Sequence, residues 1–230
     1  MSSTRAAIRT RSSRSRAWRC AAAAAAAALA LVAAAPSPAR AAEDDGVYGR
    51  FDGDLELHAG AGVAIADGGP MLAAHLDALY LSTAGIYGRY TDALGTKGPS
   101  IERSIAAGLT IQPLFLGRYA KNMEQGPARL DLFLDSIALD LGAFWHGPRQ
   151  GDFAVYPGLE VALGLSLPIL AQADGPVVTI RGALRWRAAD LSAAGAEGDL
   201  IERGAHLAIT LAWHQIVRTH LVDAGDRLKR

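Results

Sequence analysis

The chain has 230 residues, half of them hydrophobic and a fifth charged, and its 23 basic and 23 acidic side chains leave no net charge. Residues 1–41 contain seven of the basic residues and no acidic one, so residues 42–230 carry 16 basic against 23 acidic side chains, a net charge of −7. That remainder has no excess of positive charge for nucleic-acid phosphates, and it lacks the single cysteine, Cys20, so it forms no disulfide.

The first 41 residues have the organisation of a secretory signal peptide. Six arginines precede an uncharged, alanine-rich run over 20–35, which is shorter than the roughly 18–20 residues of a membrane-spanning helix. Ala39 and Ala41 then occupy the small-residue positions of a cleavage site. The sequence therefore predicts export, cleavage after Ala41, and a single domain over residues 42–230.

From residue 54 onward the chain alternates between apolar and polar or small residues, the pattern of β-strands. In DLELHAGAGVAIAD (54–67) every odd position from Leu55 to Ile65 is apolar. The same period predicts further strands at 71–80 (also short enough to be a helix), 84–90, 100–112, 136–145, 159–169, 178–186 and 206–214. Turn residues at 67–70 and 82–85 separate the first three strands. About eight sequential strands predict an all-β, up-and-down antiparallel barrel, with a two-sheet sandwich as the alternative.

One insert, residues 114–135, departs from the strand pattern. It contains helix-forming residues, a break at Gly126–Pro127, and apolar side chains at helical spacing, Leu130, Phe133 and Leu134. We predict two short amphipathic helices that cover one end of the barrel or lie on a membrane surface.

The composition of the two strand faces indicates which of them meets water. A soluble barrel carries Lys, Glu and Asp at most outward positions. Here the polar faces are mostly Gly, Ala, Ser and Thr, which suit the crowded interior of an eight-stranded barrel. The aliphatic faces suit lipid, and four aromatic residues near strand ends lie where a membrane-interface girdle belongs: Tyr80, Trp145, Trp186 and Trp213. The apolar face is therefore expected to contact a lipid bilayer.

In this pattern, residues 46–217 resemble the small eight-stranded outer-membrane β-barrel proteins of Gram-negative bacteria. The resemblance implies an outer-membrane location and a structural or weakly pore-forming, non-enzymatic role. Two features depart from that class: such barrels usually end on an aromatic residue, whereas this chain runs on to Arg230, and the 114–135 insert would lie on the periplasmic side. The alternative is a soluble periplasmic, lipocalin-like barrel that binds an apolar small molecule in a cavity lined by Leu55, Val63, Leu163 and Ile209.

The polar faces also carry titratable side chains, which are predicted to form a lumen network: Glu56, His58, His75, Asp77, Arg89, Glu102, Asp140, Glu160, Arg181 and Arg185. Because buried charges must pair, internal ion pairs are the first expectation. A polar pore, or a pocket for a small ligand or ion with Arg181 and Arg185 as an anion clamp, is the alternative.

The sequence predicts neither a metal site nor a catalytic site. His206 and His214 lie eight residues apart on one strand, about 27 Å at strand rise. A hairpin turn at 67–70 would place His58 beside Leu79 and His75 beside Gly62. A lipid A-modifying enzyme could use Ser166, His206 and Glu160, but no G-x-S-x-G nucleophile motif occurs, nor a glycine-rich phosphate loop. We therefore expect no catalytic residue and no cofactor.

Overall fold

The computed structural model describes residues 48–66, 69–94, 103–123, 126–148, 152–187 and 204–219. All of them belong to one compact unit, Ala39–Arg230. The signal peptide predicted for residues 1–41, with its cleavage site, lies outside these ranges and stays a prediction.

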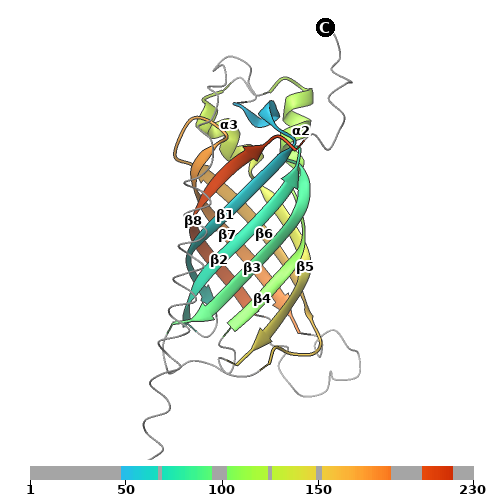
Figure 1. Ribbon diagram of the computed structural model, residues 1–230, viewed down its shortest axis with the longest axis vertical. Coiled ribbons are helices and arrows are strands. Elements are labelled where there is room, and N and C mark those ends of the chain that lie inside the picture. Colours follow the sequence, from blue (N-terminus) through green and yellow to red (C-terminus); the bar gives the residue numbers. More distant parts are fainter. Residues whose placement is uncertain are drawn as a thin grey trace, which may run out of the picture. The chain divides into compact units, whose positions relative to one another are not determined.

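Eight strands in the described part of the chain form a closed antiparallel barrel (Figure 1). Each strand pairs with its neighbours in sequence, and the last pairs with the first. The strands are β1 (Leu55–Ala66), β2 (Gly69–Tyr80), β3 (Ala84–Ala93), β4 (Arg103–Ile111), β5 (Ala138–Gly147), β6 (Gly158–Pro168), β7 (Gly175–Trp186) and β8 (Gly204–Val217). The predicted up-and-down barrel is thus confirmed in place of the sandwich, and segment 71–80 belongs to a strand.

The register of the first hairpin differs from the predicted one by two residues. His58 pairs with Asp77, and His75 pairs with Gly60. Because Ala66 pairs with Gly69, only residues 67–68 connect the two strands. Asp-Gly is a preferred sequence for such a two-residue connection, whereas the prediction centred the turn one residue later.

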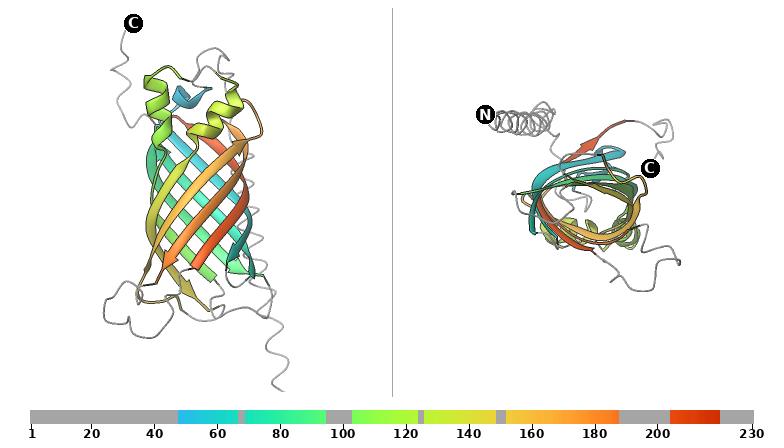
Figure 2. Two further views of the ribbon diagram at one scale, coloured as in Figure 1. Left: turned by 180° about the vertical axis from the view of Figure 1, so that it is seen from behind. Right: turned by 90° about the horizontal axis from the view of Figure 1, so that it is seen from below.

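The helices lie at one end of the barrel, which we call the capped end (Figures 1 and 2). They are α2 (Pro113–Ala120) and α3 (Ala128–Asp135), and the short 3-10 helix η1 (Arg50–Asp52) lies beside them. This confirms the two predicted short helices over a barrel end, the first of which begins one residue before the predicted insert 114–135. The capped end also holds the start of β1 and the end of β8, and we call the opposite end the distal end.

The interior of the barrel is polar through much of its length. The largest fully buried side chains of the described residues include the polar Glu160, Asp135 and Ser104 as well as Phe115 and Leu79. Apolar contacts form small clusters instead of one continuous core: Tyr48 with Leu132 and Ala173, Ala64 with Met71 and Ala73, and Tyr87 with Ala106 and Phe144. The strand period therefore directs small and charged residues inward.

Candidate functional site

The outer surface of the barrel is a belt of exposed aliphatic side chains, to which every strand contributes. One large exposed side chain from each strand illustrates it: Ile65, Leu76, Ile86, Leu109, Leu141, Leu163, Leu184 and Leu211. Their exposed fractions lie between 51% and 63%. In the described strands, the charged residues at outward positions are Asp92 and Arg103, which pair in register at the distal ends of β3 and β4. The belt between the barrel ends is therefore uncharged.

The four predicted girdle residues divide between the two ends of this belt. Tyr80 and Trp213 lie toward the capped end, whereas Trp145 and Trp186 lie at the distal ends of β5 and β7. Each alternates with inward-facing neighbours and is half-buried. The four aromatic side chains thus lie toward the two ends of the aliphatic belt.

Six of the predicted lumen residues form one chain of alternating charge: Asp77, Arg89, Asp140, Arg181, Glu160 and Arg185. Arg89 pairs with Asp77 and lies 3.8 Å from Asp140. Arg181 donates from Nε to Asp140 and from a terminal nitrogen to Glu160, both at 2.7 Å, and Arg185 Nε lies 2.5 Å from Glu160. With three acids and three bases, the chain is balanced, as burial of charge requires.

Neutral side chains complete the lumen around this chain. Tyr87 donates its hydroxyl to Glu160 at 3.1 Å, and Arg185 donates to Ser104 at 2.9 Å. His75 on β2 and Thr210 on β8 share a hydrogen bond of 3.1 Å, which is possible because the barrel closes. The Tyr87 hydroxyl approaches Gly142 so closely that a Cβ there would lie 2.4 Å from it. Because Gly142 has no side chain, the Tyr87 hydroxyl can reach Glu160.

Little space remains inside the barrel. Two of its cavities have volumes of about 30 Å³ each, room for one or two waters. Arg181 and Arg185 are buried, and both contact Glu160. They form internal ion pairs here, the first of the two expectations, and both also line one of the two small cavities.

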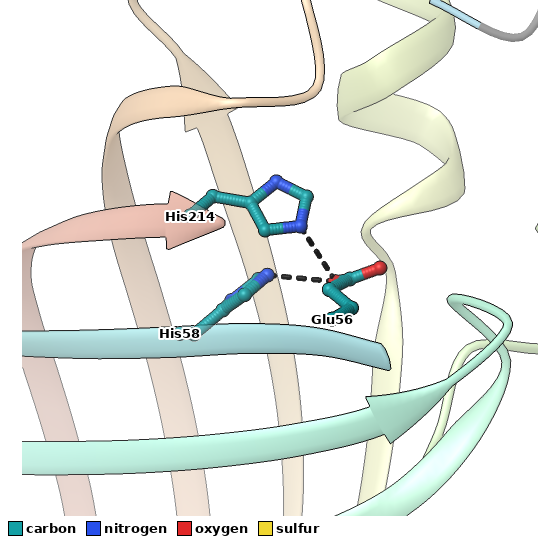
Figure 3. A group of neighbouring side chains, drawn as sticks. All are labelled: Glu56, His58 and His214. Atoms are coloured by element: carbon teal, nitrogen blue, oxygen red, sulfur yellow. Dashed lines mark ion pairs between the residues drawn. The ribbon is translucent and has the colours of Figure 1, made fainter. Parts of the chain in front are cut away.

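Glu56, His58 and His214 form a second cluster toward the capped end (Figure 3). Nε2 of His58 lies 2.7 Å from Oε1 of Glu56, and Nε2 of His214 lies 3.2 Å from the same oxygen. All three residues are buried. His214 lies directly opposite His58 across the β1–β8 seam. His214 was expected on one strand with His206, and its place against β1 could not be predicted without knowing that the barrel closes.

A third buried ionic cluster holds the helices over the barrel. Arg50 pairs with Asp135 at 2.7 Å and lies over the ring of Phe115. Arg118 pairs with Asp131 and lies 3.2 Å from Asp135. The Tyr48 hydroxyl donates to Asp131 at 2.8 Å. Sequence reasoning missed this cluster because acids on a short amphipathic helix look like a solvated face.

The turn between β6 and β7 fastens the end of β8 at the same barrel end. Asp174 accepts hydrogen bonds from the backbone N–H of Ile216 at 2.6 Å and from the Gln215 amide at 3.1 Å. Burial raises the pKa of the Asp174 carboxyl above its usual range, although the Ile216 N–H and nearby His214 oppose this. The capped end is thus closed by turns as well as helices.

The residues expected for a catalytic set or for an apolar cavity do not lie where those roles would require. Glu102 lies outside the described residues. Ser166 and His206 line different cavities, so the structure does not assemble them with Glu160 into a catalytic set. Four residues were expected to line a lipocalin-like cavity. Val63, Leu163 and Ile209 are instead exposed on the outer belt, and Leu55 is half-buried on the same face of β1 as Val63.

None of the helices in the described ranges has the length and hydrophobicity that a membrane-spanning helix requires. Comparison with known proteins finds no matching family model and no similar curated sequence.

Proposed function

We propose that the protein is an exported β-barrel that spans the outer membrane of a Gram-negative bacterium and has a structural, non-enzymatic role. The observation that carries the proposal is the inverted distribution of side chains. Apart from Asp92 and Arg103 at the distal end, the charged residues of the described strands face the lumen, while aliphatic residues of all eight strands face outward.

The size of the outer belt supports a lipid environment. Soluble monomers rarely expose a contiguous apolar patch larger than roughly 300–600 Å². This belt encircles the barrel, and many of its large side chains are half exposed or more. In hydrocarbon a closed barrel leaves no unpaired strand edge, so burial in a bilayer removes the apolar surface from water without leaving strand-edge backbone groups unsatisfied.

The strand lengths and the aromatic residues also fit a bilayer. The strands have 9 to 14 residues, and a tilted transmembrane strand needs about 9–11. Tyr80 and Trp213 at one end, and Trp145 and Trp186 at the other, match the two aromatic girdles of outer-membrane barrels. With β1 beginning and β8 ending at the capped end, that end would face the periplasm.

The filled lumen supports a structural role over a pore. The alternating charge chain crosses from β2 through β3, β5 and β6 to β7, and its members are held by ion pairs at short distances. Conduction would require these pairs to separate. In planar bilayers we therefore expect no single-channel conductance from the purified protein.

Cell fractionation tests the proposal directly. In cells that express the full chain, we expect the processed protein to remain with the outer membrane after a high-salt and alkaline wash that releases a periplasmic marker. We also expect heat-modifiable migration on gels, because a folded barrel resists detergent until it is heated. Release with the periplasmic marker would contradict the proposal and favour a soluble barrel.

A further inference from the structure

Two neighbouring strand ends bring three metal-ligating side chains together at the barrel seam. Glu56 and His58 are two residues apart on β1 and face the same side, and His214 lies opposite His58 on β8. One donor atom from each residue lies within 4.8 Å of the others. Figure 3 shows both imidazoles directed at the Glu56 carboxylate.

Both histidines of this cluster direct Nε2 at Glu56. The Nε2 atoms of His58 and His214 are buried and lie within ion-pair distance of Glu56, but neither has hydrogen-bond geometry to any partner in the described structure. A buried nitrogen that makes no well-formed hydrogen bond is costly. Two such nitrogens directed at one carboxylate oxygen form a donor set that a cation would satisfy.

We propose that Glu56, His58 and His214 bind a divalent transition-metal ion, Zn²⁺ in the first instance. Two imidazoles and one carboxylate are a ligand set that Zn²⁺ uses with a water in the fourth position, whereas Mg²⁺ and Ca²⁺ prefer oxygen ligands. Zn²⁺ bonds to imidazole nitrogen and carboxylate oxygen are about 2.0–2.1 Å long, and in a tetrahedral site they separate neighbouring donor atoms by about 3.4 Å. The Nε2 atoms of His58 and His214 lie 2.7 and 3.2 Å from Oε1 of Glu56, and one donor atom from each residue lies within 4.8 Å of the others, so side-chain shifts on the order of 1 Å complete the site.

The surroundings leave room for the fourth ligand. One of the cavities of about 30 Å³ is lined by all three residues and also by Gln112 and Ser166. A water there would complete the coordination and contact polar neighbours. Arg50 lines the same cavity, but its charge is compensated by Asp135 at 2.7 Å.

The site lies where the barrel closes, so a bound metal ion would affect the stability of the barrel. β1 and β8 are the first and last strands, and their pairing closes the barrel. An ion held by two residues of β1 and one of β8 would tie this seam together. Because it binds the closed barrel and not the separated strands, it would stabilise the folded form.

Metal titration tests the site without reference to membrane insertion. The full chain, folded in detergent micelles and freed of metal with a chelator, is titrated with Zn²⁺ against a chromophoric chelator. We expect one equivalent to bind the wild-type protein and to raise the temperature at which its folded gel band disappears. His214→Gln should weaken binding more than about 100-fold, beyond the usual loss for an outer-shell partner.

His206→Gln is the matched control, since His206 is a lumen-side histidine on the same strand that takes no part in the cluster. It should bind Zn²⁺ as the wild-type protein does. If His214→Gln fails to fold, the near-isosteric Glu56→Gln replaces it, again with loss of binding expected. The proposed site would be contradicted if the wild-type protein bound no stoichiometric Zn²⁺. It would also be contradicted if the variant of a proposed ligand bound Zn²⁺ as well as His206→Gln does.

Discussion

At the residue scale, Glu160 is the centre of the lumen network. Its side chain is 0% exposed and contacts both Arg181 and Arg185, while accepting the Tyr87 hydroxyl. In Glu160→Gln, Arg185 would lose its carboxylate partner and Arg181 would keep only Asp140. We expect the free energy of unfolding to fall by about 3 kcal/mol, as when one partner of a buried pair is removed, measured by urea titration in lipid or detergent.

Ser166→Ala provides the control for this measurement. Ser166 also lies in the lumen and bonds Thr179 at 3.0 Å, but no charge depends on it. Its loss should cost about 1 kcal/mol, the usual value of a neutral hydrogen bond. Equal effects of the two variants would show that the charges contribute no more than ordinary polar contacts.

The lumen residues could be predicted from the sequence, but their pairing could not. Asp77 and Glu160 are recognisable as inward-facing because strand side chains alternate. Which arginine each carboxylate meets depends on strand register and on the closure of the barrel, and a register error of two residues displaced His58 from its true neighbour Asp77. The contact between His58 and His214 depends on residues far apart in the sequence and so was missed.

At the element scale, the turn between β2 and β3 stores backbone strain. Leu81 and Ser82 have φ values of 48° and 51°, in the left-handed region that is unfavourable for most residues, and Thr83 N–H bonds the Tyr80 carbonyl at 3.1 Å. Leu81→Asn should raise the free energy of unfolding by about 0.5–1 kcal/mol, because asparagine tolerates this conformation. The urea titration described for Glu160→Gln measures this change in the free energy of unfolding.

Leu170→Asn is the matched substitution for that test. Leu170 lies in the β6–β7 turn at the same barrel end and has no positive φ. It should bring no gain in stability. A similar gain in both variants would mean that replacing a surface leucine, and not relief of the turn, is responsible.

The helical cap depends on ion pairs between α3 and the segment before β1. Asp135 is 1% exposed and lies 2.7 Å from Arg50 and 3.2 Å from Arg118. In Asp135→Asn the buried Arg50 loses its carboxylate, so we expect α2 and α3 to open and become sensitive to protease while the strands stay protected. Limited proteolysis with mass spectrometry reports this, and unchanged cleavage would contradict a cap held by charge.

Asp152→Asn is the control for the cap, since Asp152 is exposed outside the strands. The two helices themselves were predictable from residue spacing, as were most strands to within a few residues. Their attachment was not, because Arg50 and Asp135 lie 85 residues apart and neither carries a local signal of burial.

At the scale of the whole molecule, the outer belt distinguishes a membrane barrel from a soluble one. Leu163 lies near the middle of β6, faces outward and is 51% exposed. In water, replacing an exposed leucine with arginine changes stability by about 0.5 kcal/mol or less. At the centre of a bilayer the same change costs about 2–4 kcal/mol, because the charge must enter hydrocarbon.

Leu163→Arg should therefore lower the free energy of unfolding by about 2–4 kcal/mol when the barrel is folded in lipid vesicles. Leu130→Arg on α3 is the paired control, since Leu130 is 50% exposed but belongs to the cap and not to a strand. It should change stability little. If both variants behaved alike in vesicles, the belt would not be in contact with lipid, and the inverted arrangement of charged and aliphatic residues would need another explanation.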